Sequence, residues 1–155
     1  MDWKMLEIAL YQPDIAPNAA TILRMCACFG LPCRIIEPAG FVMSDSQFRR
    51  AGMDYLDKAV LHRDASWAAY RQATAGRRSV LLTTRAALPV WNFAFRPDDV
   101  ILMGRESVGV PEEVHTAAEA RVTIPMREGM RSLNVALACA IATGEALRQI
   151  RGGTA

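Results

Sequence analysis

The chain has 155 residues, a formal net charge of +2, 52% hydrophobic residues and a mean hydropathy of +0.10. This length suffices for one compact domain whose core needs neither disulfides nor metals. The small net charge excludes a strongly basic nucleic-acid-binding domain, and the high apolar fraction predicts that a partner covers some apolar surface, the simplest partner being a second copy in a homodimer.

The first half of the chain alternates short apolar runs with helical patterns. An apolar run over residues 6–11 ends at a Gln-Pro pair and predicts a strand. Asn18 follows a proline and precedes apolar residues at helical spacing up to Gly30, which predicts a helix with Asn18 near its N-cap. The further elements predicted in this half are strands at 33–36 and 59–62 and helices at 45–51 and 66–75.

The second half continues the alternation. Strands are predicted at 79–83, 100–103 and 122–124, with helices at 111–118 and 134–148. Strands that are apolar on both faces and alternate with helices are typical of a parallel sheet between helices. Because the chain has no linker, repeat or low-complexity tract, we expect residues 1–155 to form a single α/β domain.

The cysteines predict buried thiols rather than a metal site. They form no CxxC pair, and only His62 and His115 could complete a site, so zinc is not expected. Reduced thiols in apolar segments are typical of cytoplasmic proteins. The first residues lack signal-peptide features, and the longest apolar stretch, residues 133–147, is shorter than the ~20 residues of a membrane crossing. We therefore expect a soluble cytoplasmic protein without a metal or a membrane partner. The cysteines are Cys26, Cys28, Cys33 and Cys139.

Three segments that follow predicted strands are candidates for a ligand site, because parallel sheets bind ligands beyond the carboxyl ends of their strands. They are residues 17–24, 103–111 and 124–134. The second contains Gly104 and Gly109 but matches neither a dinucleotide nor a Walker loop. Two interpretations of it stay open: a tight turn before the next helix, or a close approach of backbone to a ligand. The first strand-to-helix turn lacks a glycine fingerprint, which argues against a dinucleotide-dependent oxidoreductase.

Together these segments resemble the motifs of the SpoU-type branch of the SPOUT superfamily of RNA methyltransferases. The resemblance extends from Leu6 to about Arg148, so it covers nearly the whole chain. It rests on Tyr11-Gln12-Pro13, Pro17-Asn18, Arg24, Ile35-Ile36-Glu37-Pro38, Arg49-Arg50-Ala51-Gly52-Met53-Asp54-Tyr55, Leu82-Thr83-Thr84, Met103-Gly104, Glu106, Gly109, Pro111, Ile124-Pro125-Met126 and Ser132-Leu133-Asn134.

The resemblance implies an enzyme that transfers a methyl group from S-adenosylmethionine to a ribose 2'-hydroxyl of tRNA. It is strongest to minimal members that act on the wobble nucleotide, cytidine or uridine 34, of the anticodon stem-loop. It also implies a C-terminal trefoil knot and a homodimer with active sites at its interface. The donor-binding residues that it implies are Leu82, Gly104, Ile124, Met126 and Ser132. Ordinary core packing at strand ends would equally explain Ile124 and Met126.

Methyl transfer requires an aligned 2'-oxygen and removal of its proton. The resemblance makes Arg24 the candidate, and because a guanidinium stays protonated, we interpret it as a clamp for a tRNA phosphate and for the developing alkoxide. Glu106 either accepts the proton or pairs with an arginine. The candidate catalytic residues are Arg24, Glu106, Ser132 and Asn134, and the candidate RNA ligands are Asn18, Arg24, Arg49, Arg50 and Arg131. Helix capping is an alternative role for Asn18, Ser132 and Asn134. A solvated surface is the alternative for each arginine cluster, including Arg77-Arg78.

Three positions depart from the family pattern. Ala20 stands where a glycine is usual, Arg105 where a proline often precedes Glu106, and Leu137 where some relatives have a second asparagine. These departures put the identity of the bound nucleotide in question. Another tRNA position, ribosomal RNA and a non-catalytic RNA-binding protein of the same fold stay open as alternatives, although the presence of all four candidate catalytic residues argues against the last.

Overall fold

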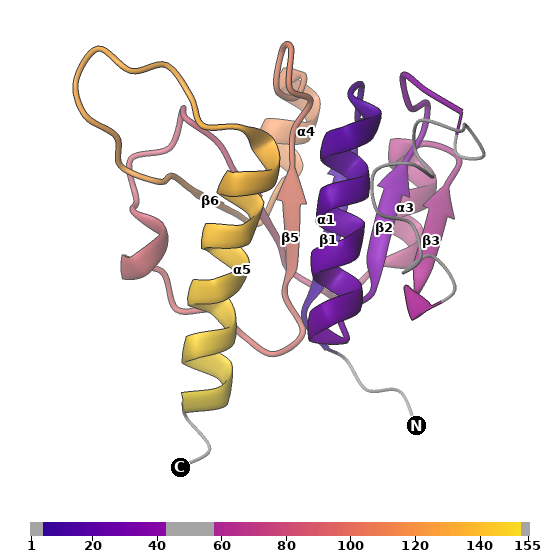
Figure 1. Cartoon of the computed structure of the whole chain (residues 1–155), viewed down its shortest axis with the longest axis horizontal. Helices are drawn as coiled ribbons and strands as arrows, with labels where there is room; N and C mark the ends of the chain where they lie inside the picture. The colour runs from indigo at the N-terminus through magenta and orange to yellow at the C-terminus, as the bar shows by residue number, and fades with distance from the viewer. Residues whose placement is uncertain (1–4, 43–57, 153–155) are drawn as a thin grey trace.

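The computed structural model describes residues 5–42 and 58–152 and contains a six-stranded sheet in the order β3-β2-β1-β5-β4-β6 (Figure 1). All neighbouring strands are parallel. The predicted parallel α/β architecture is therefore confirmed. The strands are β1 (Glu7–Tyr11), β2 (Cys33–Ile36), β3 (Leu61–Asp64), β4 (Ser79–Leu82), β5 (Val100–Met103) and β6 (Ala120–Val122).

Helices cover both faces of the sheet. Within residues 5–42 and 58–152 the helices are α1 (Ala16–Phe29), α3 (Trp67–Ala73), α4 (Glu112–Ala117) and α5 (Val135–Gly152), with a short 3-10 helix η2 (Val90–Asn92). In Figure 1, α1 and α5 lie side by side in front of the sheet, and α3 and α4 lie behind it. Alternate residues of β1 reach the two layers, because Ile8 and Leu10 pack with α1 and α5 whereas Ala9 and Tyr11 pack with α3 and α4.

Several predicted boundaries differ from the observed ones. Helix α1 begins before Asn18, because Ile15 is its N-cap and Pro17 occupies the first turn, where a missing N–H costs nothing. The strands predicted at 59–62 and 122–124 are displaced by two residues. Both are edge strands, and β3 is largely polar, so apolar runs do not mark their bounds. The helix predicted at 45–51 lies outside the described residues.

Charged residues at the amino ends of the strands are buried in pairs. Glu7 is 2% exposed, and its carboxylate pairs with both Arg34 and Arg77. Asp99 is fully buried and accepts two hydrogen bonds from Arg78, at 2.8 and 2.7 Å. The Arg77-Arg78 cluster therefore belongs to these buried pairs and is neither a phosphate site nor a solvated surface. No helix within the described ranges is long and apolar enough to span a membrane.

Candidate active site

A cavity of about 620 Å³ lies beyond the carboxyl ends of β4, β5 and β6. Residues 81–85, 103–106, 108–110 and 131–135 form much of its wall, together with Asn18 from the first turn of α1. Its volume falls in the range of about 300–1,000 Å³ that small-molecule sites occupy. The cavity thus combines the three segments that the sequence singled out, at the edge of the sheet where parallel folds bind ligands.

All five candidate donor-binding residues line this cavity: Leu82, Gly104, Ile124, Met126 and Ser132. Leu82 is the buried last residue of β4, and Ile124 packs against the core as well as lining the cavity. Ile124 therefore combines core packing with a place in the cavity wall. Much of the wall consists of apolar side chains beside the backbone of the loop that follows β5, which suits a ligand with a flat heterocycle.

The loop after β5 is a narrow hairpin. The Arg105 N–H donates to the Gly109 carbonyl at 3.1 Å, and the Gly109 N–H donates back at 2.9 Å. Gly109 has a φ of 67°, a conformation that favours glycine. A Cβ on Gly104 would lie 3.2 Å from Gly109 backbone atoms and from Val110. The tight-turn interpretation is confirmed, and this turn forms part of the cavity wall.

An asparagine pair joins the starts of α1 and α5 at the cavity. The Asn134 side-chain oxygen accepts hydrogen bonds from the backbone N–H groups of Ala136 and Leu137, at 2.8 and 3.3 Å. Its amide donates to the Asn18 side-chain oxygen at 3.1 Å. Asn134 is therefore the N-cap of α5, and the capping roles considered for Ser132 and Asn18 are wrong. Both asparagines and Ser132 line the cavity.

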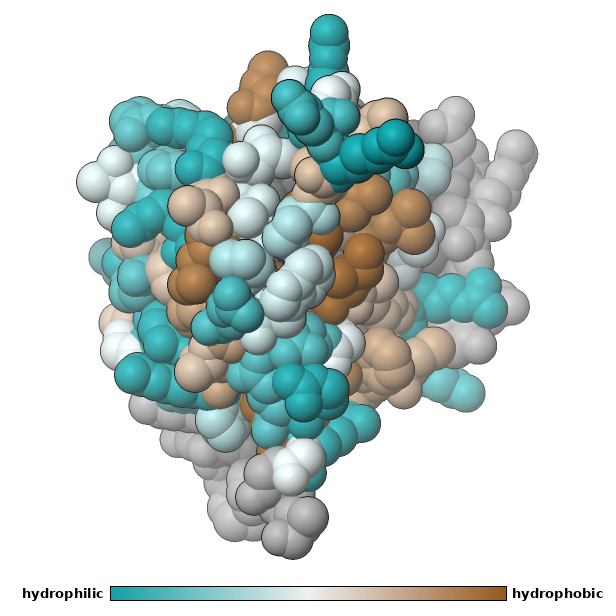
Figure 2. Space-filling view, turned by 90° about the vertical axis from the view of Figure 1, so that its left-hand side faces the viewer, coloured by the Kyte–Doolittle hydropathy of each residue, from teal (hydrophilic) through white to brown (hydrophobic). Residues whose placement is uncertain are grey.

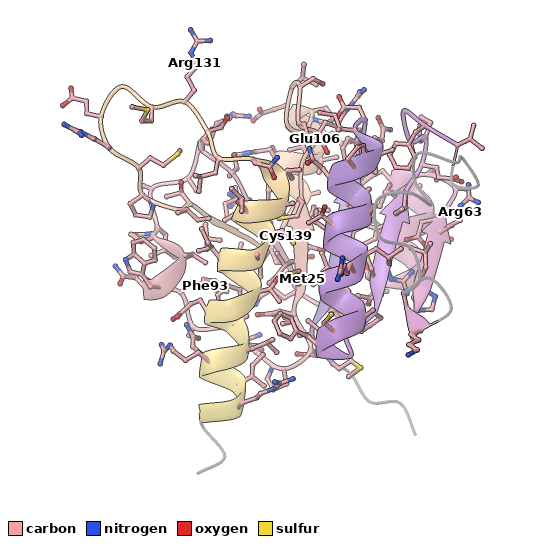
Figure 3. All side chains as sticks on the ribbon, in the orientation of Figure 1. Met25, Arg63, Phe93, Glu106, Arg131 and Cys139 are labelled. Carbon is pink, nitrogen blue, oxygen red and sulfur yellow. The ribbon has the colours of Figure 1, made fainter. Side chains whose placement is uncertain are left out.

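The candidate RNA ligands lie in different places. Arg131 lines the cavity, and Figure 3 shows it projecting from the loop after β6, away from the sheet. Arg24 is exposed on α1 and does not line the cavity. It lies six residues beyond Asn18, about 9 Å farther along the helix axis. Arg49 and Arg50 lie outside the described residues.

Glu106 lies between the starts of α1 and α5 (Figure 3) and lines the cavity. Its carboxylate accepts a hydrogen bond from the Asp14 N–H at 3.2 Å. Burial, and after it a hydrogen bond with the Asp14 side chain, raises the pKa of Glu106. The arginine next in sequence, Arg105, approaches Asp14 instead, at 4.0 Å. Among the described residues, no arginine forms an ion pair with Glu106.

Sequence reasoning missed several residues of this site. Asp14 has no place in the motifs, although its position just after β1 is a usable signal. Thr83, Thr84 and Arg85 follow β4 in the same way and line the cavity. His115 also lines it but comes from α4, and no loop pattern points to that residue.

An exposed apolar stripe runs along α5 from the rim of the cavity. Leu137 and Ile141 are 59% and 42% exposed, and their spacing of four residues places them on one face of α5. Leu133, two residues before the helix begins, is 38% exposed. Ile15, beside the start of α1, is 43% exposed. Figure 2 shows apolar side chains gathered on the side of the molecule where α1 and α5 lie. These four residues are called the α5 stripe below.

Comparison with known proteins places this site in a family. Residues 5–144 match the model of the SpoU rRNA Methylase family. The chain belongs to this family. It is 61% identical over 145 residues to a tRNA (cytidine(34)-2'-O)-methyltransferase of Beijerinckia indica, covering 92% of this chain and 91% of the relative. An Escherichia coli K12 protein of the same name is 36% identical over 148 residues, covering 94% of each chain.

Solved structures agree with the family assignment. One, described as giving structural insights into the 2-OH methylation of C/U34 on tRNA, has a TM-score of 0.92 and 39% identity, and the match covers 96% of this chain and 97% of that one. An AdoMet-bound rRNA methyltransferase from Sinorhizobium meliloti has a TM-score of 0.84 and 25% identity, with 93% of this chain and 56% of that chain covered. The SpoU-type resemblance in the sequence is confirmed.

Proposed function

We propose that this family member transfers a methyl group from S-adenosylmethionine to the ribose 2'-hydroxyl of the wobble nucleotide, cytidine or uridine 34, of tRNA. The observation that carries the proposal is the cavity beyond β4, β5 and β6, in a chain 61% identical to a tRNA (cytidine(34)-2'-O)-methyltransferase over nearly its full length. The AdoMet-bound relative from Sinorhizobium meliloti supports the identity of the donor.

The residues of the cavity fit this donor. Its wall offers apolar side chains that can cover an adenine. Backbone groups can read the edge of the adenine ring, so charged side chains are not needed for that contact. Leu82, Gly104, Ile124, Met126 and Ser132 would hold the donor. When bound, S-adenosylmethionine supplies a methyl group on a positively charged sulfur. The protein's part is to align the ribose oxygen with that methyl group and to remove the proton.

Four residues position the substrates and remove the proton. Arg24 binds a tRNA phosphate and stabilises the negative charge that develops on the 2'-oxygen. Glu106, at the cavity wall, accepts the 2'-hydroxyl proton while the oxygen–carbon bond forms and the sulfur–carbon bond breaks. Asn134 fixes the start of α5, and Ser132 in the preceding loop contributes a hydroxyl to the donor side. Asn18, Arg131, Arg49 and Arg50 complete the RNA-binding set.

A homodimer joined through α1 and α5 accounts for two features. The α5 stripe exposes apolar side chains that a partner would cover. Arg24 is exposed on α1 and stands outside the cavity of its own chain, so an active site at the interface would let it serve the partner's cavity. In this arrangement each active site takes its donor pocket from one subunit and its Arg24 from the other.

A trefoil knot is supported by the course of the chain around β6. The Thr123 N–H donates to the Leu88 carbonyl, and the Val90 N–H donates to the Thr123 carbonyl, so the chain after β6 runs against the β4–η2 connection. Helix α5 then packs against β4, β5 and η2. We also propose a single domain and a cytoplasmic location, which the four free thiols and a tRNA substrate favour.

The direct test is transfer of labelled methyl from S-adenosylmethionine to tRNA that lacks wobble methylation, followed by nucleoside mass spectrometry. We expect a 2'-O-methyl pyrimidine at position 34. Methylation at another position or of ribosomal RNA would show that the protein is a methyltransferase with a different RNA substrate. Donor binding without transfer to any RNA would instead indicate a non-catalytic RNA-binding protein.

Subunit mixing tests the shared active site. Arg24→Ala and Gly104→Val chains are unfolded together, refolded and assayed at a donor concentration well below the wild-type Kd, where each variant alone has at most about a tenth of wild-type activity. If Arg24 acts across the interface, each mixed dimer regains one intact site, and the mixture recovers about a quarter of wild-type activity. No recovery, with mixed dimers demonstrated by mass spectrometry, would mean that Arg24 and the donor pocket belong to one subunit.

A further inference from the structure

Asp14, in the loop between β1 and α1, has its backbone fixed from two sides. The Gly40 N–H donates to the carbonyl of the preceding Pro13 at 2.8 Å, and a Cβ on Gly40 would lie 2.9 Å from the Asp14 Cα. On the other side, the Asp14 N–H donates to the Glu106 carboxylate at 3.2 Å. The loop after β2 therefore supports Asp14 from behind, and Asp14 in turn contacts the residue at the cavity wall.

The Asp14 side chain is also fixed, by contacts with the loop that follows β5. The Ser107 hydroxyl donates to Asp14 Oδ2 at 2.5 Å, and the Arg105 guanidinium lies 4.0 Å from the same oxygen. Oδ1 is buried and has no hydrogen-bond partner among the described residues. A buried carboxylate oxygen without a donor is costly, and a protonated neighbouring carboxyl group would supply the missing donor.

That neighbour is Glu106. In its protonated form the Glu106 carboxyl group would donate to Asp14, and this interaction lowers the pKa of Asp14 to about 2. Burial, and after it the same interaction, raises the pKa of Glu106. When the pair holds one proton, the proton therefore resides on Glu106, and Asp14 stays charged. Paired carboxyl groups commonly divide a proton in this unequal way.

We propose that Asp14 is a positioning residue for methyl transfer, which fixes the Glu106 carboxyl group at the cavity wall and provides the negative neighbour that makes Glu106 a stronger base. The proposal rests on the assignment of Glu106 as proton acceptor. In the reaction the 2'-oxygen gives its proton to Glu106 and its electron pair to the methyl carbon, while the sulfur keeps the pair of the broken bond. Glu106 becomes neutral, and the Asp14 carboxylate accepts a hydrogen bond from it.

The effect of Asp14 on the pKa of Glu106 can be measured through the pH dependence of the reaction. Arg85, Arg105, Arg131 and His115 line the same cavity as Glu106. Glu113 on α4 and Arg105 both act on the Tyr11 hydroxyl. Burial and Asp14 raise the pKa of Glu106, so removal of the Asp14 charge lowers that pKa. A base acts only when deprotonated, so the acidic limb of the kcat/KM profile would move to lower pH.

The experiment compares pH profiles of kcat/KM for the wild type, Asp14→Asn, Glu106→Gln and the double variant. We expect the acidic limb to move down by about one pH unit in Asp14→Asn, with kcat about tenfold lower and donor Kd unchanged. Glu106→Gln should lose about a hundredfold in kcat together with the acidic limb, and Asp14→Asn should have no further effect in that background. Glu128→Gln, at an exposed carboxylate in the loop after β6, serves as control and should leave the profile in place.

Carbon-13 NMR of the side-chain carboxyl groups in the full-length wild type gives a readout independent of activity and of any variant's folding. We expect Asp14 to titrate near the acidic end of the range, with Glu106 above its ordinary range and the two curves coupled. Independent titrations, or an Asp14→Asn profile that loses rate without moving its acidic limb, would overturn the positioning role. An acidic limb retained in Glu106→Gln would instead overturn the assignment of the proton acceptor.

Discussion

The two ends of the sheet contain the same kinds of charged residue, arranged for different purposes. At the amino ends, Glu7 and Asp99 are almost completely buried, and each is matched by arginines. At the carboxyl ends, Glu106 and Arg131 line an open cavity, and Asp14 Oδ1 is buried without a hydrogen-bond partner among the described residues. Close pairing with arginine, at 2.8 Å for Glu7 and 2.7 Å for Asp99 against 4.0 Å for Asp14, therefore distinguishes the amino ends of the strands from the carboxyl ends.

The difference also bears on how each end responds to change. A buried pair that loses one member leaves an uncompensated charge and destabilises the whole fold. A cavity residue that contacts a ligand affects binding or rate, and the fold keeps its stability. We therefore expect substitutions at the amino ends to change the free energy of unfolding, and substitutions at the carboxyl ends to change donor binding or turnover.

The largest effect on stability is expected for Glu7→Gln. The change leaves Arg34 and Arg77 facing a neutral amide in a buried site, and a broken buried pair costs about 3–5 kcal/mol. We expect the lower part of that range, because Arg34 keeps Asp64 as a partner. Urea unfolding measures the loss. The matched control is Glu37→Gln, whose partner Arg63 is 52% exposed, and it should cost about 1 kcal/mol or less. Equal losses would contradict the distinction between buried and exposed pairs.

Among the proposed catalytic residues, Arg24→Ala is expected to reduce kcat by about a hundredfold to a thousandfold, which is typical for loss of a group that stabilises developing negative charge. Donor Kd, measured by calorimetry, should stay near the wild-type value, since Arg24 does not line the cavity. Arg148→Ala, at an exposed arginine of α5, is the control and should keep full activity. Parallel loss of donor binding and rate in Arg24→Ala would mean that the residue supports the pocket itself.

Gly104→Val tests the cavity wall, and its expected effect on donor Kd is smaller than the effect of Arg24→Ala on kcat. The new Cβ would lie 3.2 Å from Gly109 and Val110, so the hairpin must move and narrow the donor site. We expect donor Kd to rise at least about tenfold, equivalent to about 1.4 kcal/mol. Gly144→Ala is the control, because no atom lies within 4 Å of its new Cβ and alanine suits a helix interior. Unchanged donor affinity in Gly104→Val would remove the hairpin from the donor site.

Much of the fold could be predicted from the sequence, because interior strands and long helices have strong apolar patterns. Strands β2, β4 and β5 and the helices α1 and α5 were found within a few residues. The edge strands β3 and β6 were displaced, since a strand with one neighbour needs less apolar surface and its pattern is weaker. The start of α1 was misplaced because Asn18 has the chemistry of a cap, whereas Pro17 fixes the first turn.

The candidate site was predictable where motif residues stand at or after the end of a strand. Leu82 ends β4, Gly104 follows β5 and Ile124 follows β6, and all three line the cavity. The Asn134–Asn18 hydrogen bond joins residues 116 positions apart, and the Asp14–Glu106 hydrogen bond joins residues 92 positions apart. Periodicity carries no information about such pairs, because they arise from the way the loops meet in three dimensions. For the same reason, the buried role of Arg77 and Arg78 could not be separated from a phosphate site beforehand.

The smallest effect is expected for Tyr70→Phe, which tests a buried hydrogen bond at the amino end of β4. The Tyr70 hydroxyl and the Ser79 hydroxyl form a buried hydrogen bond of 2.7 Å. Tyr70→Phe leaves the serine unsatisfied and should cost about 1–2 kcal/mol in unfolding free energy, with activity unchanged. Replacing both partners, as Tyr70→Phe with Ser79→Ala, removes the unsatisfied group, so the double variant should lose less than the sum of the two single losses. Additive losses in urea unfolding would mean that the two hydroxyls are not coupled, and that mutual satisfaction of polar groups does not govern stability at this end of the sheet.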